Sequence, residues 1–515
     1  MSDMLKRIKE MEEKRERMKQ GGGQERIKAQ HQRGKGTARE RINTLVDEGT
    51  FIELNPFLKN NGAAETKHVT HGEGVVTGYA KIDGRQVFLF SQDFTVDGGA
   101  LGEKHAFKIA NVMDLAAENG APIIGLNDSG GAKIQEGVLS LDGYGHIFYR
   151  NTKYSGVIPQ ISVIMGPCAG GAVYSPALTD FIFMVEKTSQ MFITGPKVME
   201  SITGTTVDAE SLGGAGIHAG VSGNAHFTAS TEERVLTDVR RLLRFLPSDY
   251  KEKPPVQQTK QQGTVRLDKL LDIVPADSSK GYDIRSVLKC VLDEEEFMEV
   301  HAGFAKNMVI GFGRINGGTV GIVANNPKVM AGGLDIDSSD KCARFIRFCD
   351  SFHIPIITFE DVSGFIPGLQ QEHQGIIRHG AKILYAYAEA TVPKITVILR
   401  KAYGGAYVAL NSKAIGADIV LAWPSAEIAV MGPAGAAPII YGKEIEKSAD
   451  SEETRRKKTE EYRDQFANPY IAAENGMVDD IIDPRDTRFH LVKTLEMLDC
   501  KDQVNFRKKH GNIPL

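Results

Sequence analysis

The sequence has few cysteines, no long apolar run and no strong excess of charge of either sign. Its five cysteines lie far apart and none forms a Cys-x-x-Cys pair, which excludes a zinc ribbon and is typical of reduced thiols. No apolar run approaches the ~20 residues that cross a bilayer, and the charged N-terminus lacks a signal-peptide core. We therefore expect a cytoplasmic location and no direct membrane insertion.

The charge balance disfavours another group of partners. Lys and Arg total 62 against 66 for Asp and Glu, so the net charge is −4 and nothing favours binding to nucleic acid. The sequence has no Gly-x-x-x-x-Gly-Lys-Ser/Thr loop for a nucleotide phosphate. His, Cys and carboxylate residues are nowhere grouped at metal-ligand spacing, so we expect no metal site.

What the sequence does have is one short pattern that occurs twice. The first copy is Gly166-Pro-Cys-Ala-Gly-Gly-Ala-Val-Tyr-Ser175, and the second is Arg400-Lys-Ala-Tyr-Gly-Gly-Ala-Tyr-Val-Ala409. Each follows a β-branched apolar run and precedes a stretch of helix formers, which predicts a strand, a glycine turn and a helix. Glycines let a ligand approach the backbone, and the free N–H groups of a helix N-terminus can bind an anion. Two such turns indicate an enzyme that stabilises two oxyanions.

The repeat extends well beyond this pattern. The spacing is 233 from Pro122 to Pro355, 234 from Gly170 to Gly404 and 237 from Pro196 to Pro433. A period this long, seen twice, indicates a duplicated domain and not a solenoid. Strands alternate with helices in both halves, so we expect an α/β fold with a largely parallel sheet in each copy.

Composition divides the chain into four parts. We expect an N-terminal helical segment over 1–45, in which Thr37-Ala-Arg-Glu40 is a capping-box pattern that opens a helix. The first domain covers 46–250. Prolines, glutamines and little apolar periodicity predict a linker over 251–280, and the second domain covers 281–515.

Each copy has a second turn at the end of a strand. Ser129-Gly130-Gly131 in the first copy matches Val362-Ser363-Gly364 in the second. Ligands of α/β proteins bind at the carboxyl ends of the strands, so each copy is expected to bring two turns to one edge. Backbone N–H groups that converge there form an oxyanion hole for an enolate or a tetrahedral intermediate.

Two other interpretations concern single side chains. Gly166-Pro-Cys168-Ala-Gly170 also fits a nucleophile elbow with Cys in place of Ser, which indicates a thiol hydrolase. No His or Asp partner can be assigned from the sequence, so a buried structural residue explains Cys168 better. The second copy has Ala402 at that place. His373, Arg378 and His379 fit helix capping and subunit packing better than catalysis.

Several longer motifs resemble the biotin-dependent acyl-CoA carboxyltransferases, over essentially the whole chain. These motifs are the two copies of the glycine pattern, Ser91-Gln-Asp-Phe-Thr-Val, Asn127-Asp-Ser-Gly-Gly-Ala, Asp335-Ile-Asp-Ser-Ser-Asp-Lys, Gly375-Ile-Ile-Arg-His-Gly-Ala-Lys and the terminal His510-Gly-Asn-Ile-Pro-Leu515. The branches of the family that the chain resembles most are the propionyl-CoA carboxylase beta subunit and the methylmalonyl-CoA decarboxylase alpha subunit.

The resemblance implies a fold and a set of site residues. It implies two tandem duplicated crotonase-like (ClpP/crotonase) domains in a homo-hexamer, with acyl-CoA on the first domain and biotin on the second domain of a neighbouring subunit. The enolate oxygen of the thioester would bind at Gly170 and Gly171, and the ureido oxygen of biotin at Gly405 and Ala406. The remaining expected substrate-binding residues are Gly130, Gly131, Ser363, Gly364 and Val408, of which Val408 would influence the accepted acyl chain.

The implied activity moves a carboxyl group from carboxybiotin to a short-chain acyl-CoA, so that propionyl-CoA becomes methylmalonyl-CoA. Because the sequence has no Met-Lys-Met tripeptide, the biotin would be carried on a partner, a biotin carboxyl carrier subunit, alongside a biotin carboxylase. Two alternatives stay open: the alpha subunit of a sodium-pumping methylmalonyl-CoA decarboxylase, and a thiol hydrolase that uses Cys168. A non-catalytic scaffold is less well supported, since it needs no duplicated turns.

The chain departs from the family at three positions. Lys133 stands where many members have Arg, Ser363 where many have Pro, and Gly36 where a larger apolar residue is usual. None of the three belongs to a glycine pair, so the departures bear on substrate preference more than on reaction type.

Overall fold

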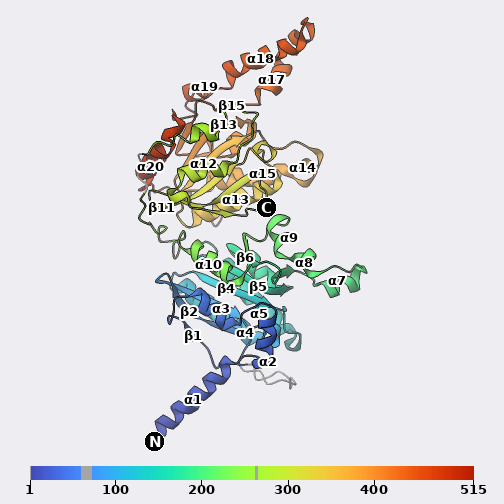
Figure 1. The fold of residues 1–515 in the computed structure, drawn as a ribbon, viewed down its shortest axis with the longest axis vertical. Helices are drawn as coiled ribbons and strands as arrows, with labels where there is room; N and C mark the ends of the chain where they lie inside the picture. Colours follow the sequence, from blue (N-terminus) through green and yellow to red (C-terminus); the bar gives the residue numbers. More distant parts are fainter. Residues whose placement is uncertain (1, 60–71, 261–264) are drawn as a thin grey trace. The chain divides into compact units, whose positions relative to one another are not determined.

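The computed structural model describes residues 2–59, 72–260 and 265–515. Residues 261–264 of the predicted linker and 60–71 of the predicted first domain lie outside the described residues. The chain divides into two compact units, Met1–Glu252 and Lys253–Leu515 (Figure 1). Each unit is described by itself below.

The first unit is built on one mixed sheet of order β1-β2-β3-β4-β5-β6-β8, with β7 paired to β5. The strands are β1 (Ile52–Leu54), β2 (Val75–Ile82), β3 (Arg85–Gln92), β4 (Ile123–Ser129), β5 (Gln160–Ala169), β6 (Phe181–Val185), β7 (Gln190–Phe192) and β8 (Phe227–Ala229). The pairs from β3 onward are parallel, while β1, β2 and β3 are antiparallel. All residues of β4 and β6 are buried, as expected for parallel strands covered on both faces.

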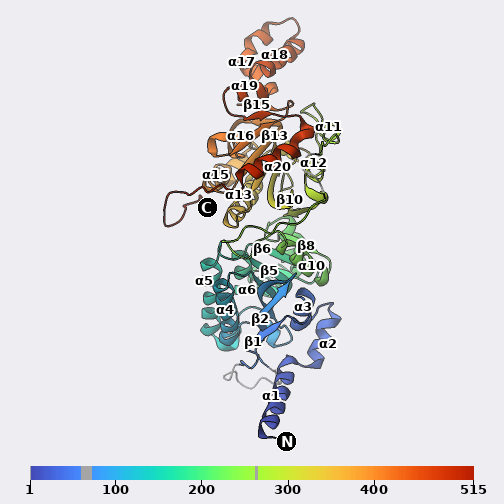
Figure 2. The same ribbon diagram turned by 90° about the vertical axis from the view of Figure 1, so that its left-hand side faces the viewer.

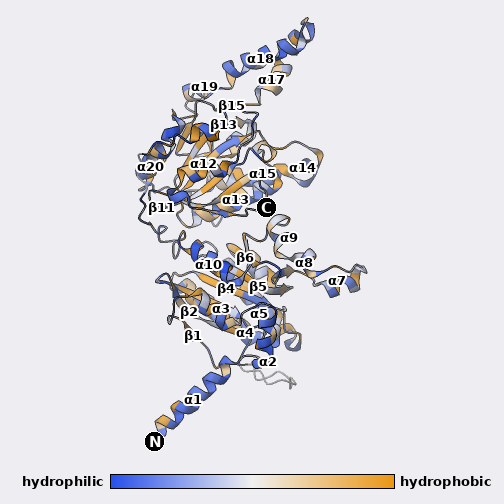
Figure 3. Cartoon of the chain, viewed as in Figure 1, coloured by the Kyte–Doolittle hydropathy of each residue, from blue (hydrophilic) through white to orange (hydrophobic). Residues whose placement is uncertain are grey.

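Helices cover both faces of this sheet. The helices of the whole unit, some of which lie away from the sheet, are α1 (Asp3–Lys19), α2 (Gln24–Gln32), α3 (Ala38–Leu45), α4 (Glu103–Glu118), α5 (Val138–Lys153), α6 (Gly171–Leu178), α7 (Pro196–Thr203), α8 (Ala209–Gly213), α9 (Ala215–Gly220) and α10 (Glu232–Leu243). Helices α4 and α5 lie on one face, and α3 and α10 lie on the other (Figure 2). The predicted capping box is present, since Thr37 and Glu40 exchange side chain-to-backbone hydrogen bonds. The exposed α1, and α18 (Ser451–Phe466) of the second unit, are hydrophilic along most of their length (Figure 3).

The second unit repeats the first strand for strand, which confirms the predicted duplication. Its sheet has the order β16-β14-β13-β12-β11-β10-β9, with β15 paired to β13. Thus β10 to β14 correspond to β2 to β6, and β15 corresponds to β7. The strands are β9 (Phe297–Val300), β10 (Met308–Ile315), β11 (Gly318–Asn325), β12 (Ile356–Val362), β13 (Lys394–Tyr403), β14 (Ile419–Ala422), β15 (Glu427–Ala429) and β16 (Asp480–Ile481).

The helices of the second unit follow the same plan. They are α11 (Leu270–Ile273), α12 (Ile284–Val291), α13 (Ile336–Ser351), α14 (Leu369–Gln374), α15 (Ile376–Glu389), α16 (Gly404–Ala409), α17 (Pro433–Lys447), α18 (Ser451–Phe466), α19 (Pro469–Glu474) and α20 (Thr487–Leu498). Helices α13 and α15 lie on one face of the sheet and α12 and α20 on the other (Figure 2). Part of the segment expected to be a linker belongs to this unit, because Leu267, Leu270 and Val274 are buried in its core.

A fully buried aspartate ends the central strand of each unit, one residue before the second predicted turn. In the first unit Asp128 binds Lys35 (Nζ–Oδ2 2.7 Å) and Arg41 (Nη1–Oδ2 2.9 Å), both from the N-terminal segment. In the second unit Asp361 binds Arg400 (Nε–Oδ2 2.8 Å) and the Tyr282 hydroxyl (3.0 Å). A carboxylate without a cation at this depth would be strongly destabilising.

The two units therefore neutralise the same carboxylate from different directions. Arg400 belongs to the neighbouring strand β13, and the spacing of the repeat places Gly166 of β5 at the equivalent position. A methyl group on Gly166 would lie 1.9 Å from Asp128 Oδ1 and 2.5 Å from Lys35 Nζ. Glycine is required there because the cations approach from outside the sheet.

We expect Arg400→Met to destabilise the second unit by about 3–5 kcal/mol, since Asp361 would keep a buried charge without its main partner. The single tryptophan, Trp423, is buried in the core of this unit, so its fluorescence during urea unfolding measures the effect. Lys253→Met is the matched control: it removes the exposed pair with Asp499 and should cost at most about 1 kcal/mol. The double variant Arg400→Met, Asp361→Leu should recover much of the loss, and equal losses in both single variants would contradict the assignment.

Candidate functional site

The first glycine turn joins β5 to α6. Gly170 has φ +57°, a left-handed conformation that favours glycine, and its N–H donates to the Phe192 carbonyl at 3.1 Å. Helix α6 then begins at Gly171, and among the described residues the N–H groups of Gly171 and Ala172 have no hydrogen-bond partner. The predicted turn is present, but the donors that remain available lie one residue further along than the predicted pair.

The second glycine turn joins β13 to α16 in the same way. Gly404 has φ +62°, and α16 begins there. Gly405 and Ala406 follow in its first turn, and their N–H groups have no hydrogen-bond partner among the described residues. Gly405 and Ala406 are the positions equivalent to Gly171 and Ala172. The repeat therefore pairs the free donors of the two units residue by residue.

The two turns differ in what covers them. A methyl group on Gly171 would lie 2.8 Å from the ring of Tyr144, which α5 packs against the turn, so glycine is needed for this close approach. Around Gly405 a methyl group would meet no atom within 4 Å. An aromatic ring therefore covers the Cβ position of the first turn, whereas the Cβ position of the second turn is open.

The second pair of predicted turns lies at the edge of each sheet, and the turn of the first unit uses its own donors. The Gly130 N–H donates to the Gly98 carbonyl (2.9 Å), and the Gly131 N–H donates to Ser129 Oγ (3.2 Å). The Gly131 carbonyl accepts from Leu101 at 2.8 Å, and the Gly364 carbonyl accepts from Leu334 at 3.0 Å. These bonds tie each turn to the segment after the preceding strand. A direct contact of Gly130, Gly131, Ser363 or Gly364 with substrate stays a prediction.

Three further predicted positions have clear environments. Val408 lies in α16 with 36% of its side chain exposed, so it does not belong to the core. Lys133 is buried and pairs with Asp97 (3.1 Å) and Glu136 (3.4 Å), and these carboxylates raise its pKa against the opposing effect of burial. The Gly36 N–H donates to Glu232 at 3.0 Å, next to Arg41.

Cys168 lies in β5 with its thiol fully buried. Burial raises its pKa to about 12, and the nearby Asp128 charge adds to the effect. A thiol in this environment stays protonated at neutral pH and is not nucleophilic. The geometry therefore opposes the thiol hydrolase interpretation. His379 binds Asp340 (Nδ1–Oδ1 2.9 Å) and Arg378 donates to the terminal Leu515 carbonyl (3.0 Å), which are packing contacts.

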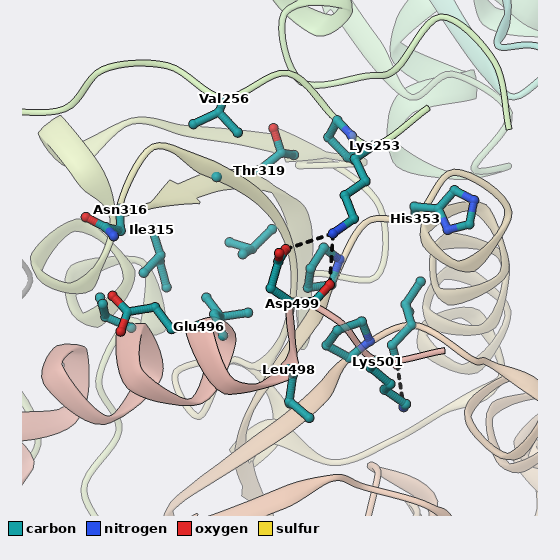
Figure 4. Close-up of a pocket in the computed structure, with 18 of the residues that line it drawn as sticks. Lys253, Val256, Ile315, Asn316, Thr319, His353, Glu496, Leu498, Asp499 and Lys501 are labelled. Atoms are coloured by element: carbon teal, nitrogen blue, oxygen red, sulfur yellow. Dashed lines mark hydrogen bonds and ion pairs between the residues drawn. The ribbon is translucent and has the colours of Figure 1, made fainter. Parts of the chain in front are cut away.

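A cavity of about 500 Å³ lies in the second unit at the opposite ends of the strands (Figure 4). Its lining includes Pro355 and Pro393, which directly precede β12 and β13, whereas Gly404 directly follows β13. The Lys253–Asp499 ion pair crosses its rim. The cavity is therefore separate from the glycine turns and from the chemistry expected there.

Sequence reasoning missed the groups that support the turns. It gave no role to the aspartates at the strand ends or to Tyr144 beside Gly171. Their partners are distant in sequence, since Arg41 meets Asp128 and Tyr144 meets Gly171 only in the folded chain. Within the described parts of the chain, no group of three His, Cys, Asp or Glu residues could hold a metal ion. No helix in those parts has the length and apolar character to span a membrane.

Comparison with known proteins gives consistent matches over the whole chain. A family model described as the carboxyl transferase domain matches residues 29–513. The putative propionyl-CoA carboxylase beta chain of Bacillus subtilis is 63% identical over 98% of both chains, and the methylmalonyl-CoA decarboxylase subunit alpha of Propionigenium modestum is 55% identical over 100% of both. The hexameric transcarboxylase 12S, solved with methylmalonyl-coenzyme A and methylmalonic acid bound, is 51% identical with a TM-score of 0.96, over 100% of this chain and 99% of that one.

The environment of Cys168 predicts how the native protein reacts with iodoacetamide at pH 8. The exposed Cys500 should be alkylated, while Cys168 should react only after unfolding in guanidinium. Mass spectrometry of tryptic peptides measures both. Alkylation of native Cys168 as fast as Cys500, with loss of a measurable thioesterase activity, would restore the hydrolase interpretation.

Proposed function

Because the chain belongs to the family of the carboxyl transferase domain, with two tandem duplicated crotonase-like domains, we propose that this carboxyltransferase moves a carboxyl group between carboxybiotin and a short-chain acyl-CoA, propionyl-CoA or methylmalonyl-CoA. The observation that carries the proposal is the pair of equivalent turns, Gly170-Gly171-Ala172 and Gly404-Gly405-Ala406, each with backbone donors left free at a helix start. Transfer between two carbonyl-containing partners needs two oxyanion sites, and the two turns supply one candidate for each.

In the first domain we assign the thioester to the Gly171 turn. Loss of the α-proton places negative charge on the thioester oxygen, and the N–H groups of Gly171 and Ala172 are available to stabilise it. Gly170 then has a shaping role, because its own N–H is bound to Phe192. The Tyr144 ring behind Gly171 keeps the turn in place.

In the second domain we assign biotin to the Gly405 turn. Carboxybiotin supplies the carboxyl group, and its ureido oxygen takes negative charge as that group leaves. The N–H groups of Gly405 and Ala406 can hold this oxygen, and the space in front of Gly405 leaves room for a ring to approach. The residues present therefore fit the group that the family implies. No protein base is needed if the ureido nitrogen accepts the α-proton.

The proposal includes partners and a location. Biotin would arrive on a carrier subunit that a biotin carboxylase charges, and six copies of this chain would form the core, as the 12S structure does. The protein would work in the cytoplasm. The same geometry serves transfer in the opposite direction. Relatives named methylmalonyl-CoA decarboxylase subunit alpha are as much as 55% identical, so a decarboxylase role is the second candidate.

The direct test is a half-reaction with the purified chain alone. With methylmalonyl-CoA and free biotin it should form propionyl-CoA slowly and without ATP, since the sequence has neither a phosphate loop nor a biotinylation tripeptide. Chromatography of the CoA esters measures the product, and omission of biotin is the control. ATP-dependent carboxylation of propionyl-CoA with no partner present would contradict the proposal.

A substitution separates the second oxyanion site from the fold. Gly405→Val should reduce kcat of the half-reaction by roughly 10²–10³-fold, since its side chain would occupy the open space at the turn, where an added Cβ meets no atom within 4 Å. Gly442→Val in α17 is the control, because a methyl group there also meets nothing within 4 Å. Melting temperature and size-exclusion volume should stay unchanged in both. Activity retained in Gly405→Val would remove this turn from the site.

A further inference from the structure

One exposed apolar residue lies beside each glycine turn, at equivalent places in the two units. In the first unit β7 runs parallel to β5, with Phe192 opposite Ala169, so the next residue, Ile193, lies beside Gly170. In the second unit β15 runs parallel to β13, with Ala429 opposite Tyr403, so Val430 lies beside Gly404. Strands β7 and β15 thus place equivalent residues beside the two glycine turns.

The contacts confirm this closeness. A methyl group on Gly170 would lie 3.8 Å from the Ile193 carbonyl oxygen, and one on Gly404 would lie 3.1 Å from the Val430 carbonyl oxygen. The Gly170 N–H also donates to Phe192, the residue before Ile193. Yet the side chains themselves are free: 56% of Ile193 and 85% of Val430 is exposed.

A second apolar residue completes each turn. Tyr174 in α6 lies three positions after Gly171 and is 52% exposed, and Val408 in α16 lies three positions after Gly405 and is 36% exposed. A single exposed apolar side chain on a protein surface needs no explanation. The Tyr174 ring contacts Phe148 (ring centroids 6.1 Å apart) but stays 52% exposed. Exposed apolar side chains that recur at equivalent places around two equivalent turns do need an explanation.

We propose that Ile193 and Val430 are specificity-determining residues, Ile193 packing against the acyl thioester in the first domain and Val430 against the biotin ring in the second. The inference rests on the proposed function, which assigns these two substrates to these two turns. Both ligands present apolar surface next to an oxygen that becomes charged. An apolar wall at that place excludes water, and backbone N–H groups stabilise an oxyanion far better in a water-poor site.

The positions of Ile193 and Val430 explain why these residues, and not the residues before them, would contact a ligand. Phe192 and Ala429 are partly buried by their own strands, whereas Ile193 and Val430 are the first residues beyond the paired region. They are followed by Gly195-Pro196 and Gly432-Pro433, where α7 and α17 begin and project from their units (Figure 1). Ile193 and Val430 are therefore held beside the turns by β7 and β15, just before the chain continues into α7 or α17.

The test uses two substitutions, each of which should raise the KM for one substrate and leave the KM for the other unchanged. In the half-reaction of methylmalonyl-CoA with free biotin, Ile193→Ser should raise KM for methylmalonyl-CoA roughly 10-fold and leave KM for biotin unchanged. Val430→Ser should do the reverse. The conservative variants Ile193→Val and Val430→Ile should keep both constants close to those of the unmodified chain, because an apolar wall is retained.

Two matched controls lie further along the same projecting segments. Ile202 in α7 and Ile439 in α17 are 75% and 71% exposed but lie far from the turns in sequence. Ile202→Ser and Ile439→Ser should change neither constant, and size-exclusion chromatography of all variants follows the oligomeric state. If both constants rise together in a site variant, or the controls behave like the site variants, the residues act through assembly and the inference is wrong.

The outcomes also separate this inference from the proposed function. If the unmodified chain forms no propionyl-CoA from methylmalonyl-CoA and biotin, the proposed function itself fails. If the unmodified chain is active and the two constants do not split, only the roles of Ile193 and Val430 are lost.

Discussion

A buried carboxylate at the end of a central strand is the constraint on which both units depend. Asp128 and Asp361 lie one residue before the turn that ties the strand end to its neighbour, so each must be held without net charge. Burying a charge is tolerated only with a well-placed counter-charge and further hydrogen bonds. At the strand ends, Lys35 and Arg41 in the first unit and Arg400 and Tyr282 in the second are placed to satisfy this group.

Much of the fold could be predicted because its signals are local or repeated. The glycine turns, the alternation of strands and helices, and the spacing from Gly170 to Gly404 are all visible in the sequence. The site was predicted less completely. That the Gly170 N–H is used by Phe192 depends on the register of β7, a three-residue strand with no pattern of its own. Contacts between distant segments, such as Tyr144 with Gly171, leave no periodic trace.

The two units kept their framework while their surroundings diverged. An aromatic ring covers the Cβ position of Gly171 in the first turn, and the equivalent position at Gly405 in the second turn is open. The departures from the family pattern fit this picture, since Lys133 and Gly36 both belong to polar networks that support the edge of the first sheet and do not form part of a turn. One backbone design thus presents two different ligand environments at the same point of the fold.

The cation and the carboxylate are synthesised in opposite order in the two units, so the buried charge is neutralised at a different stage of synthesis in each. Lys35 and Arg41 are synthesised well before Asp128, so in the first unit the cations emerge first and wait for their carboxylate. In the second unit Asp361 emerges before Arg400, and the carboxylate waits for its cation. Domains fold largely in the order of synthesis. A nascent chain released between residues 361 and 400 would therefore contain Asp128 with both of its cations, but Asp361 without Arg400.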